Sequence, residues 1–166
     1  MRLFIALWPD DEVRRQLAAA QAAWGWRSRA VRVPPERLHL TLHFLGEVSE
    51  PVAEALRERL PPSGLACELC LDRPSLWPHG IAVLEAGTVP PALAELHGEL
   101  ALRLQALGLR TEGRAFRPHV TLARHAQGSR PPSGFESIRW AVSGYALVHS
   151  RSGPPLHYEL LQQVGV

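Results

Sequence analysis

The sequence reads Arg37-Leu38-His39-Leu40-Thr41-Leu42 in its first half and Arg117-Pro118-His119-Val120-Thr121-Leu122 in its second. Both stretches follow the pattern R-x-H-x-T-L, and the two histidines lie 80 positions apart (119 − 39). Apolar residues alternate with the histidine and the threonine, which is the period-two pattern of a half-buried strand. Each stretch therefore predicts a strand that buries one face and presents an imidazole and a hydroxyl on the other.

The segments around these two strands predict an α+β protein. We expect one domain over residues 1–166 with two lobes, built on two antiparallel or mixed sheets with helices outside and one motif strand in each half. The other expected strands are 3–8, 65–72, 81–85, 140–149 and 156–162, with a loop at 74–80. The expected helices run from Asp10-Asp11 to about Trp24, from Ser49-Glu50-Pro51 to about Leu60, and from 88–91 to Gly108.

Charge and residue usage exclude several classes of chemistry. The net charge is only +2, but residues 103–166 hold eight arginines against three acids, whereas residues 1–102 hold ten against thirteen. This basic second half is either a solvated surface or a surface that attracts a polyanion. All eighteen basic residues are arginine, so mechanisms that need a lysine nucleophile or a Walker lysine are excluded.

Cysteines and hydropathy indicate a protein of the cytoplasm. Cys67 and Cys70 form an isolated C-x-x-C on an expected strand, which favours half-buried thiols over a zinc site, because such a site would need a second pair. No stretch reaches the ~20 apolar residues of a membrane span. We expect a monomer without a membrane partner.

The two motifs together can supply acid–base chemistry. Hydrolysis of a phosphodiester needs a base that takes a proton from water and an acid that protonates the departing oxygen. Histidine can do either near neutral pH. Threonine hydroxyls can donate hydrogen bonds to the phosphate oxygens, on which negative charge grows. If the two motifs face one pocket, this set can open a strained 2',3'-cyclic phosphate without a metal.

On these residues the chain resembles the two-histidine (2H) phosphoesterases. The stretches His39-Leu40-Thr41-Leu42-His43-Phe44-Leu45-Gly46-Glu47 and Arg117-Pro118-His119-Val120-Thr121-Leu122-Ala123-Arg124 are similar to the paired H-x-T-x signatures of that family. Within the family, the chain looks most like the RNA 2',3'-cyclic phosphodiesterases, also called 2'-5' RNA ligases. The resemblance implies a bilobal, pseudo-twofold fold with both motifs in a central cleft, and hydrolysis of a 2',3'-cyclic phosphate to a 2'-phosphate. The reverse reaction would join RNA ends through a 2'-5' linkage.

The resemblance also implies roles for individual residues. His39 is the expected proton donor to the 3' oxygen and His119 the expected proton acceptor from water, although the motifs alone leave this division open. Arg124 is expected on the phosphate, provided that a bulge or strand end turns it toward the cleft. His43 shares the parity of His39 and is expected in the cleft. Phe4, Trp77 and Tyr158 are expected either to stack on a base or to pack in the core.

Two other functions fit the same residues. One is an RNA-end binding protein without catalysis, which the small net charge disfavours. The other is a zinc hydrolase that uses His39, His43, His119 or His125 as ligands. The preferred interpretation needs no metal and no other cofactor, and its partner is RNA with a 2',3'-cyclic phosphate end or a small cyclic nucleotide.

Overall fold

The protein folds around a single curled sheet, and the computed structural model describes residues 1–165. The sheet has nine strands in the order β7-β4-β5-β6-β3-β1-β8-β9, with β2 paired to β6, and every pairing is antiparallel. The strands are β1 Arg2–Leu7, β2 Val31–Arg32, β3 Leu40–Glu47, β4 Cys67–Trp77, β5 Ile81–Ala86, β6 His119–Arg124, β7 Ile138–Val142, β8 Tyr145–Arg151 and β9 His157–Val164. The helices are α1 Asp11–Ala22, α2 Glu50–Arg59 and α3 Pro91–Ala106, with short 3-10 turns at Pro35–Arg37 and Pro78–Gly80.

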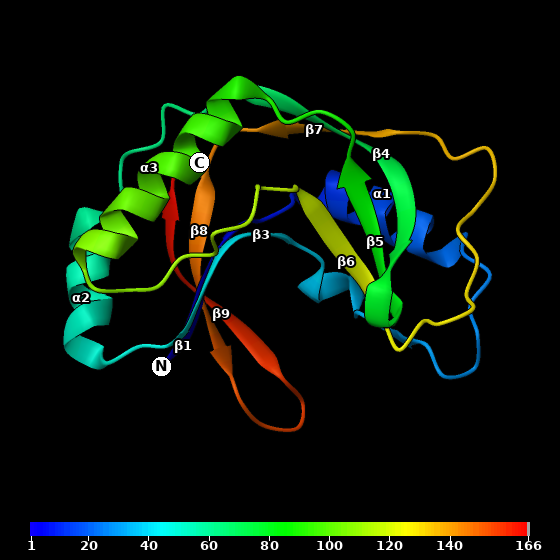
Figure 1. Ribbon diagram of the computed structural model, residues 1–166, viewed down its shortest axis with the longest axis horizontal. Coiled ribbons are helices and arrows are strands. Elements are labelled where there is room, and N and C mark those ends of the chain that lie inside the picture. The colour runs from blue at the N-terminus through cyan, green and yellow to red at the C-terminus, as the bar shows by residue number, and fades with distance from the viewer. Residues whose placement is uncertain (166) are drawn as a thin grey trace.

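The α+β class is as predicted, but the two expected sheets are joined into one. The strands form two groups, β7-β4-β5-β6 and β3-β1-β8-β9, which meet where the motif strands β6 and β3 lie side by side. Within residues 1–165, Leu40 and Val120 are the one residue pair that joins the two groups. In Figure 1 α2 and α3 lie beside one group of strands and α1 beside the other. The two motifs, 80 residues apart in the chain, therefore meet in the middle of the sheet.

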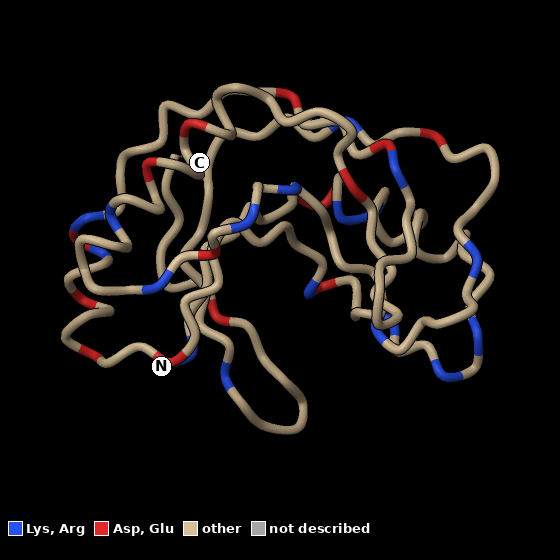
Figure 2. The backbone as a smooth tube through the Cα atoms, in the orientation of Figure 1, with Lys and Arg blue, Asp and Glu red and all other residues tan. Residues whose placement is uncertain are grey.

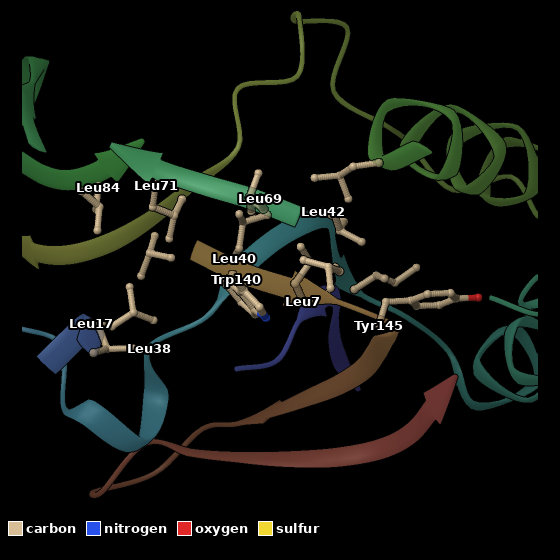
Figure 3. Packing of buried hydrophobic residues seen from close by; sticks show 14 of the residues in the cluster. Leu7, Leu17, Leu38, Leu40, Leu42, Leu69, Leu71, Leu84, Trp140 and Tyr145 are labelled. Carbon is tan, nitrogen blue, oxygen red and sulfur yellow. The ribbon is translucent and has the colours of Figure 1, made fainter. Parts of the chain in front are cut away.

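The apolar residues that predicted the elements form the core. Asp10 caps α1 by accepting a hydrogen bond from the amide of Val13 at 2.8 Å. The leucines of α3 at positions 93, 96, 100 and 104 are buried, and their spacing of three and four residues puts them on one face of the helix. Figure 3 shows leucines of β1, β3, β4 and β5 and the ring of Trp140 pointing into this core, which leaves the other face of the motif strands for the site.

Two predicted boundaries are wrong for reasons of sheet pairing. Strand β4 continues to Trp77 through the expected loop, because residues 73–77 pair with β5. The expected strand over residues 140–149 is two strands separated by Ser143-Gly144. Val142 pairs with β4 in one group, whereas Tyr145 pairs with β9 in the other. A Cβ on Gly144 would lie 2.2 Å from the carbonyl oxygen of Val164, so only glycine fits at this crossing.

Within residues 1–165, no helix has the length and apolar character needed to cross a membrane.

Candidate active site

The seam between β3 and β6 brings the two motifs together. Leu40 and Val120 are paired across it and are fully buried, so the residues that flank them point to the opposite face. Continued in the antiparallel direction, this register places His39 toward Thr121 and Thr41 toward His119. The two imidazoles therefore lie diagonally across the seam.

A bulge follows the threonine in each motif strand. On β3, Thr41 pairs with Ala6 and His43 with Ile5, so Leu42 is an extra residue. On β6, Thr121 pairs with Val83 and Ala123 with Ala82, so Leu122 is an extra residue. Each extra residue reverses the alternation of faces beyond it. Phe44 and Arg124, both three residues after a threonine, consequently share the threonine's face.

The bulge on β3 places His43 on the face of the strand opposite to the one predicted. This side chain is 5% exposed and lies on the face opposite to His39, where its Nε2 is 2.9 Å from the carbonyl oxygen of His97. Its ring stacks on the ring of His97 at 4.1 Å between centroids. The prediction that His43 lines the cleft is wrong, because strict alternation does not hold across a bulge.

One pocket collects the predicted catalytic groups. It encloses about 520 Å³. Three of its lining residues are arginines, and none carries a carboxylate. The lining consists of Arg2, Phe4, Val33, Arg37, His39, Thr41, Phe44, His119, Thr121, Arg124, Ser150, Leu156 and Tyr158. The pocket is therefore suited to an anion of the size of a nucleotide.

Both catalytic candidates are oriented by the same local contact. Nδ1–H of His39 donates to the carbonyl oxygen of Arg37 at 2.6 Å, and Nδ1–H of His119 donates to that of Arg117 at 2.7 Å. A carbonyl can only accept, so each neutral ring carries its proton on Nδ1 and leaves Nε2 as the basic atom. Nε2 of His39 lies 3.2 Å from the hydroxyl of Thr41.

The surroundings of His39 are aromatic and cationic. The ring of Trp8 stacks on it at 5.6 Å, and Phe4 and Tyr158 contact it at 4.9 and 5.5 Å between centroids. The pKa of His39 is lowered to about 4, chiefly by burial and further by the positive charges of Arg14 and His119. The hydrogen bond to Arg37 opposes this change only in part. A protonated His39 would therefore give up its proton more readily than an ordinary imidazolium.

The surroundings of His119 contain a carboxylate, and this feature was not foreseen from the sequence. Glu85, 6% exposed, is paired with His119 across β5 and β6 and accepts a 2.6 Å hydrogen bond from Arg117. The Arg117 guanidinium lies over the ring of Trp77 at 4.6 Å, and that ring lies 4.4 Å from His119. The pKa of His119 is lowered, chiefly by burial and further by the charge of Arg117, whereas the hydrogen bond to the Arg117 carbonyl and the charges of Glu85 and Glu112 oppose the change. A carboxylate favours a protonated ring here, in contrast to His39.

The remaining predicted residues divide into two groups. Phe4 and Tyr158 line the pocket, where they also contact the ring of His39. Trp77 packs behind His119 and is outside the lining. Arg124 reaches the pocket through the bulge that its prediction required.

The zinc alternative needs ligands that converge. His43 lies on the opposite face of β3, and His125 is an exposed residue with φ +53° at the end of β6. Within residues 1–165 no group of three or more His, Cys, Asp or Glu side chains is arranged to hold a metal ion. The four histidines named for zinc therefore do not form a ligand set.

The chain is similar to known proteins in both sequence and structure. The family model described as "2'-5' RNA ligase superfamily" matches residues 9–154. The chain belongs to the 2'-5' RNA ligase superfamily. The resemblance drawn from the two motifs is thus confirmed.

Relatives in this superfamily match nearly the whole chain. A Thermus thermophilus protein named RNA 2',3'-cyclic phosphodiesterase is 35% identical over 93% of this chain and 84% of its own length. An Escherichia coli protein of the same name is 34% identical over 90% of this chain and 86% of its own. The crystal structure of E. coli LigT with 3'-AMP superposes with a TM-score of 0.82 at 30% identity, covering 98% of this chain and 95% of that one.

Proposed function

We propose that this protein hydrolyses the 2',3'-cyclic phosphate at RNA ends to a 2'-phosphate, without a metal. The observation that carries the proposal is the placement of two histidines, each with Nδ1–H bound to a carbonyl, around one arginine-lined pocket. The similar proteins named RNA 2',3'-cyclic phosphodiesterase support the same substrate.

The pocket holds the phosphate by charge and by hydrogen bonds. Arg124 donates to the non-bridging oxygens, and its planar guanidinium can bind two of them at once. Thr41 and Thr121 donate their hydroxyl protons to the same oxygens as negative charge grows on them. The phosphate's own charge favours protonated imidazoles, so substrate binding raises the pKa of both histidines.

The two histidines move two protons. Nε2 of His119 takes a proton from water as the water oxygen bonds to phosphorus. The bond from phosphorus to the 3' oxygen breaks, and His39 gives its Nε2 proton to that oxygen. The products are a 2'-phosphate and a 3'-hydroxyl. The carboxylate of Glu85 stabilises the charge that His119 gains, and the aromatic and cationic surroundings of His39 favour loss of its proton. Run in reverse with an RNA 5'-hydroxyl in place of water, the same steps would make a 2'-5' linkage.

The test uses RNA ending in a 2',3'-cyclic phosphate, in EDTA. We expect turnover, with the phosphate retained on the 2' oxygen. His39→Ala and His119→Ala should each lower kcat by about 10²–10⁴-fold, because each removes one proton-transfer group. His157→Ala is the matched control, since this exposed histidine lies outside the pocket.

Two results would refute the proposal. Full turnover in either active-site variant would show that the substituted histidine does not transfer the proton assigned to it. Tight RNA binding that survives both substitutions, with no turnover in the unmodified protein, would favour the RNA-end binding function instead.

A further inference from the structure

One rim of the pocket is rich in arginine and free of acids. Residues 24–35 and 124–135 contain no Asp or Glu, and together they carry Arg27, Arg29, Arg32, Arg124 and Arg130. All five side chains are exposed. Within residues 1–165 none of them lies in an ion pair, whereas Arg15, Arg57 and Arg139 elsewhere are each paired with a glutamate. We call these two segments the arginine rim.

Hydrogen bonds join the two segments of the arginine rim to each other. Gly25 and Arg130 exchange bonds of 2.9 and 3.0 Å between their amides and carbonyls. The amide of Arg27 donates to Oγ of Ser129 at 3.0 Å, and its Nε donates to the carbonyl of Gly128 at 3.1 Å. Figure 2 shows the arginines of both segments at the lower right, on one end of the molecule. These hydrogen bonds fix the backbone from which the arginine side chains extend, and the guanidinium of Arg27 is held as well.

The rim is continuous with the pocket. Strand β2 pairs with β6, with Val31 opposite Arg124, so the two segments lie next to each other at the pocket edge. Arg32 pairs with the buried Ala123 and so extends from the other face of the sheet, which leaves Arg27, Arg29, Arg124 and Arg130 as the candidates for phosphate binding. Val33 and Arg124 belong both to the rim and to the pocket lining. An RNA whose terminal phosphate sits between the histidines can therefore place its next phosphates along these residues.

The opposite rim offers a different surface. It is formed by the β8–β9 hairpin, which contributes Ser150, Leu156 and Tyr158 to the lining. Its arginine, Arg151, donates to Glu159 at 2.6 Å, so its charge is already balanced. The pocket lining also holds Arg2 and Arg37 on the side of the hairpin, so the phosphate at the RNA end meets positive charge on both sides. Beyond the pocket, the hairpin arginine is balanced by Glu159, whereas within residues 1–165 the arginine rim carries unpaired charge, which favours a path of the RNA strand along the arginine rim.

We propose that the arginine rim binds the phosphates of the RNA strand upstream of the cyclic end, so that the preferred substrate is an oligonucleotide and not a cyclic mononucleotide. This inference rests on the proposed function and names its substrate class. Binding to such a rim is electrostatic and independent of base sequence.

The test compares two substrates in two triple variants. Arg27→Gln/Arg29→Gln/Arg130→Gln removes three rim charges, and of these side chains only Arg27 makes a hydrogen bond within residues 1–165, to the carbonyl of Gly128. Arg15→Gln/Arg57→Gln/Arg139→Gln removes the same charge from ion-paired sites outside the rim and the pocket. The substrates are a 2',3'-cyclic mononucleotide and a short single-stranded RNA with a 2',3'-cyclic phosphate end.

We expect the rim variant to raise KM for the oligonucleotide by about tenfold and to leave mononucleotide turnover unchanged. The slope of log KM against log salt should fall by about two, since each lost phosphate contact on a single strand removes about 0.7. The control variant should behave like the unmodified protein. An unchanged KM in the rim variant, or an equal effect in the control, would overturn the proposal.

A binding measurement separates this proposal from the proposed function. Fluorescence anisotropy of a labelled RNA ending in a 2'-phosphate needs no turnover. If neither substrate is hydrolysed but the rim variant still binds this RNA more weakly than the control does, the rim proposal stands and the hydrolytic function falls. If the rim variant and the control variant bind this RNA equally, the proposal that the arginine rim binds RNA is refuted, whether or not the protein hydrolyses either substrate.

Discussion

At the scale of single residues, the two histidines share their orientation and differ in their neighbours across the sheet. The residue paired with His119 is Glu85. Leu7 pairs with Leu40, so the next residue, Trp8, lies opposite His39 and stacks on it. Both rings contact an indole, but only His119 has a carboxylate paired with it across the sheet. This difference supports the proposed division into an acceptor, His119, and a donor, His39, which the near-identical motifs leave open.

Glu85→Gln should therefore change the acid–base behaviour of His119. The charged groups around that ring are Glu85, Glu112, Arg117 and His39. Loss of the Glu85 charge removes an interaction that favours the protonated ring, so the pKa of His119 falls. Two readouts should respond: NMR titration of the His119 ring should move to lower pH, and so should the acidic limb of kcat/KM.

A merely structural role for Glu85 would leave the titration in place and lower only the thermal stability. The control is Glu68→Gln on β4, where an exposed glutamate pairs with Arg139 at 3.5 Å. Its removal should leave the titration of His119 unaltered. A wild-type titration of His119 in Glu85→Gln would contradict the assignment.

The four motif residues could be predicted from the sequence because a repeated H-x-T on alternating apolar residues determines which face they share. Glu85 could not be predicted in this way. Its role depends on the register of β5 against β6, which is a long-range pairing without a local signal. An isolated glutamate after Ile81–Leu84 has the same appearance as any residue at a strand end.

At the scale of elements, the two bulges decide which side chains enter the pocket. They place Phe44 and Arg124 at equivalent positions, one aromatic and one cationic. Phe44 is 49% exposed and lies 5.2 Å from the Arg2 guanidinium, so its ring is available to a base. Alternation predicted the strands well, but a bulge depends on both partner strands, and so the positions after the threonines were misplaced on β3.

The bulge on β3 can be tested with two neighbouring substitutions. His43→Ala should destabilise the protein by on the order of 2 kcal/mol, because it removes a buried ring stacked on His97. The same substitution should leave KM nearly unchanged. Phe44→Ala should raise KM for a 2',3'-cyclic nucleotide by about tenfold through lost stacking. Chemical denaturation and steady-state kinetics measure the two effects. The reverse pattern, with KM sensitive at His43 and not at Phe44, would mean that β3 has no bulge.

At the scale of the whole molecule, the pocket exists only because two distant segments meet at one seam. Strands β3 and β6 share a single residue pair, and both groups of strands contribute lining residues, with Arg124 from β6 and Arg2, Phe4 and Tyr158 from β1 and β9. The class of fold follows from the order of elements. The joining of two expected sheets into one follows from contacts between residues 80 positions apart, which local patterns do not specify.

The histidines packed around this seam should make the stability of the whole protein depend on pH. The pKa values of His39 and His97 are lowered to about 4, mainly by burial, and those of His43 and His119 are also lowered. The unfolded chain therefore binds more protons than the folded protein between pH 6.5 and about 4. Stability is complete above pH 6.5 and falls as the pH drops through this window.

Each unit of pKa difference corresponds to about 1.4 kcal/mol, so His39 and His97 together should cost roughly 2–4 kcal/mol after allowance for solvent screening. Urea denaturation at pH 7 and pH 4.5 measures the loss. His97→Phe keeps a ring between His43 and Phe116 but removes one titrating group, so it should reduce the loss. His157→Ala, at an exposed site, should not. Equal stability of the unmodified protein at the two pH values would show that these rings are not held neutral by the fold.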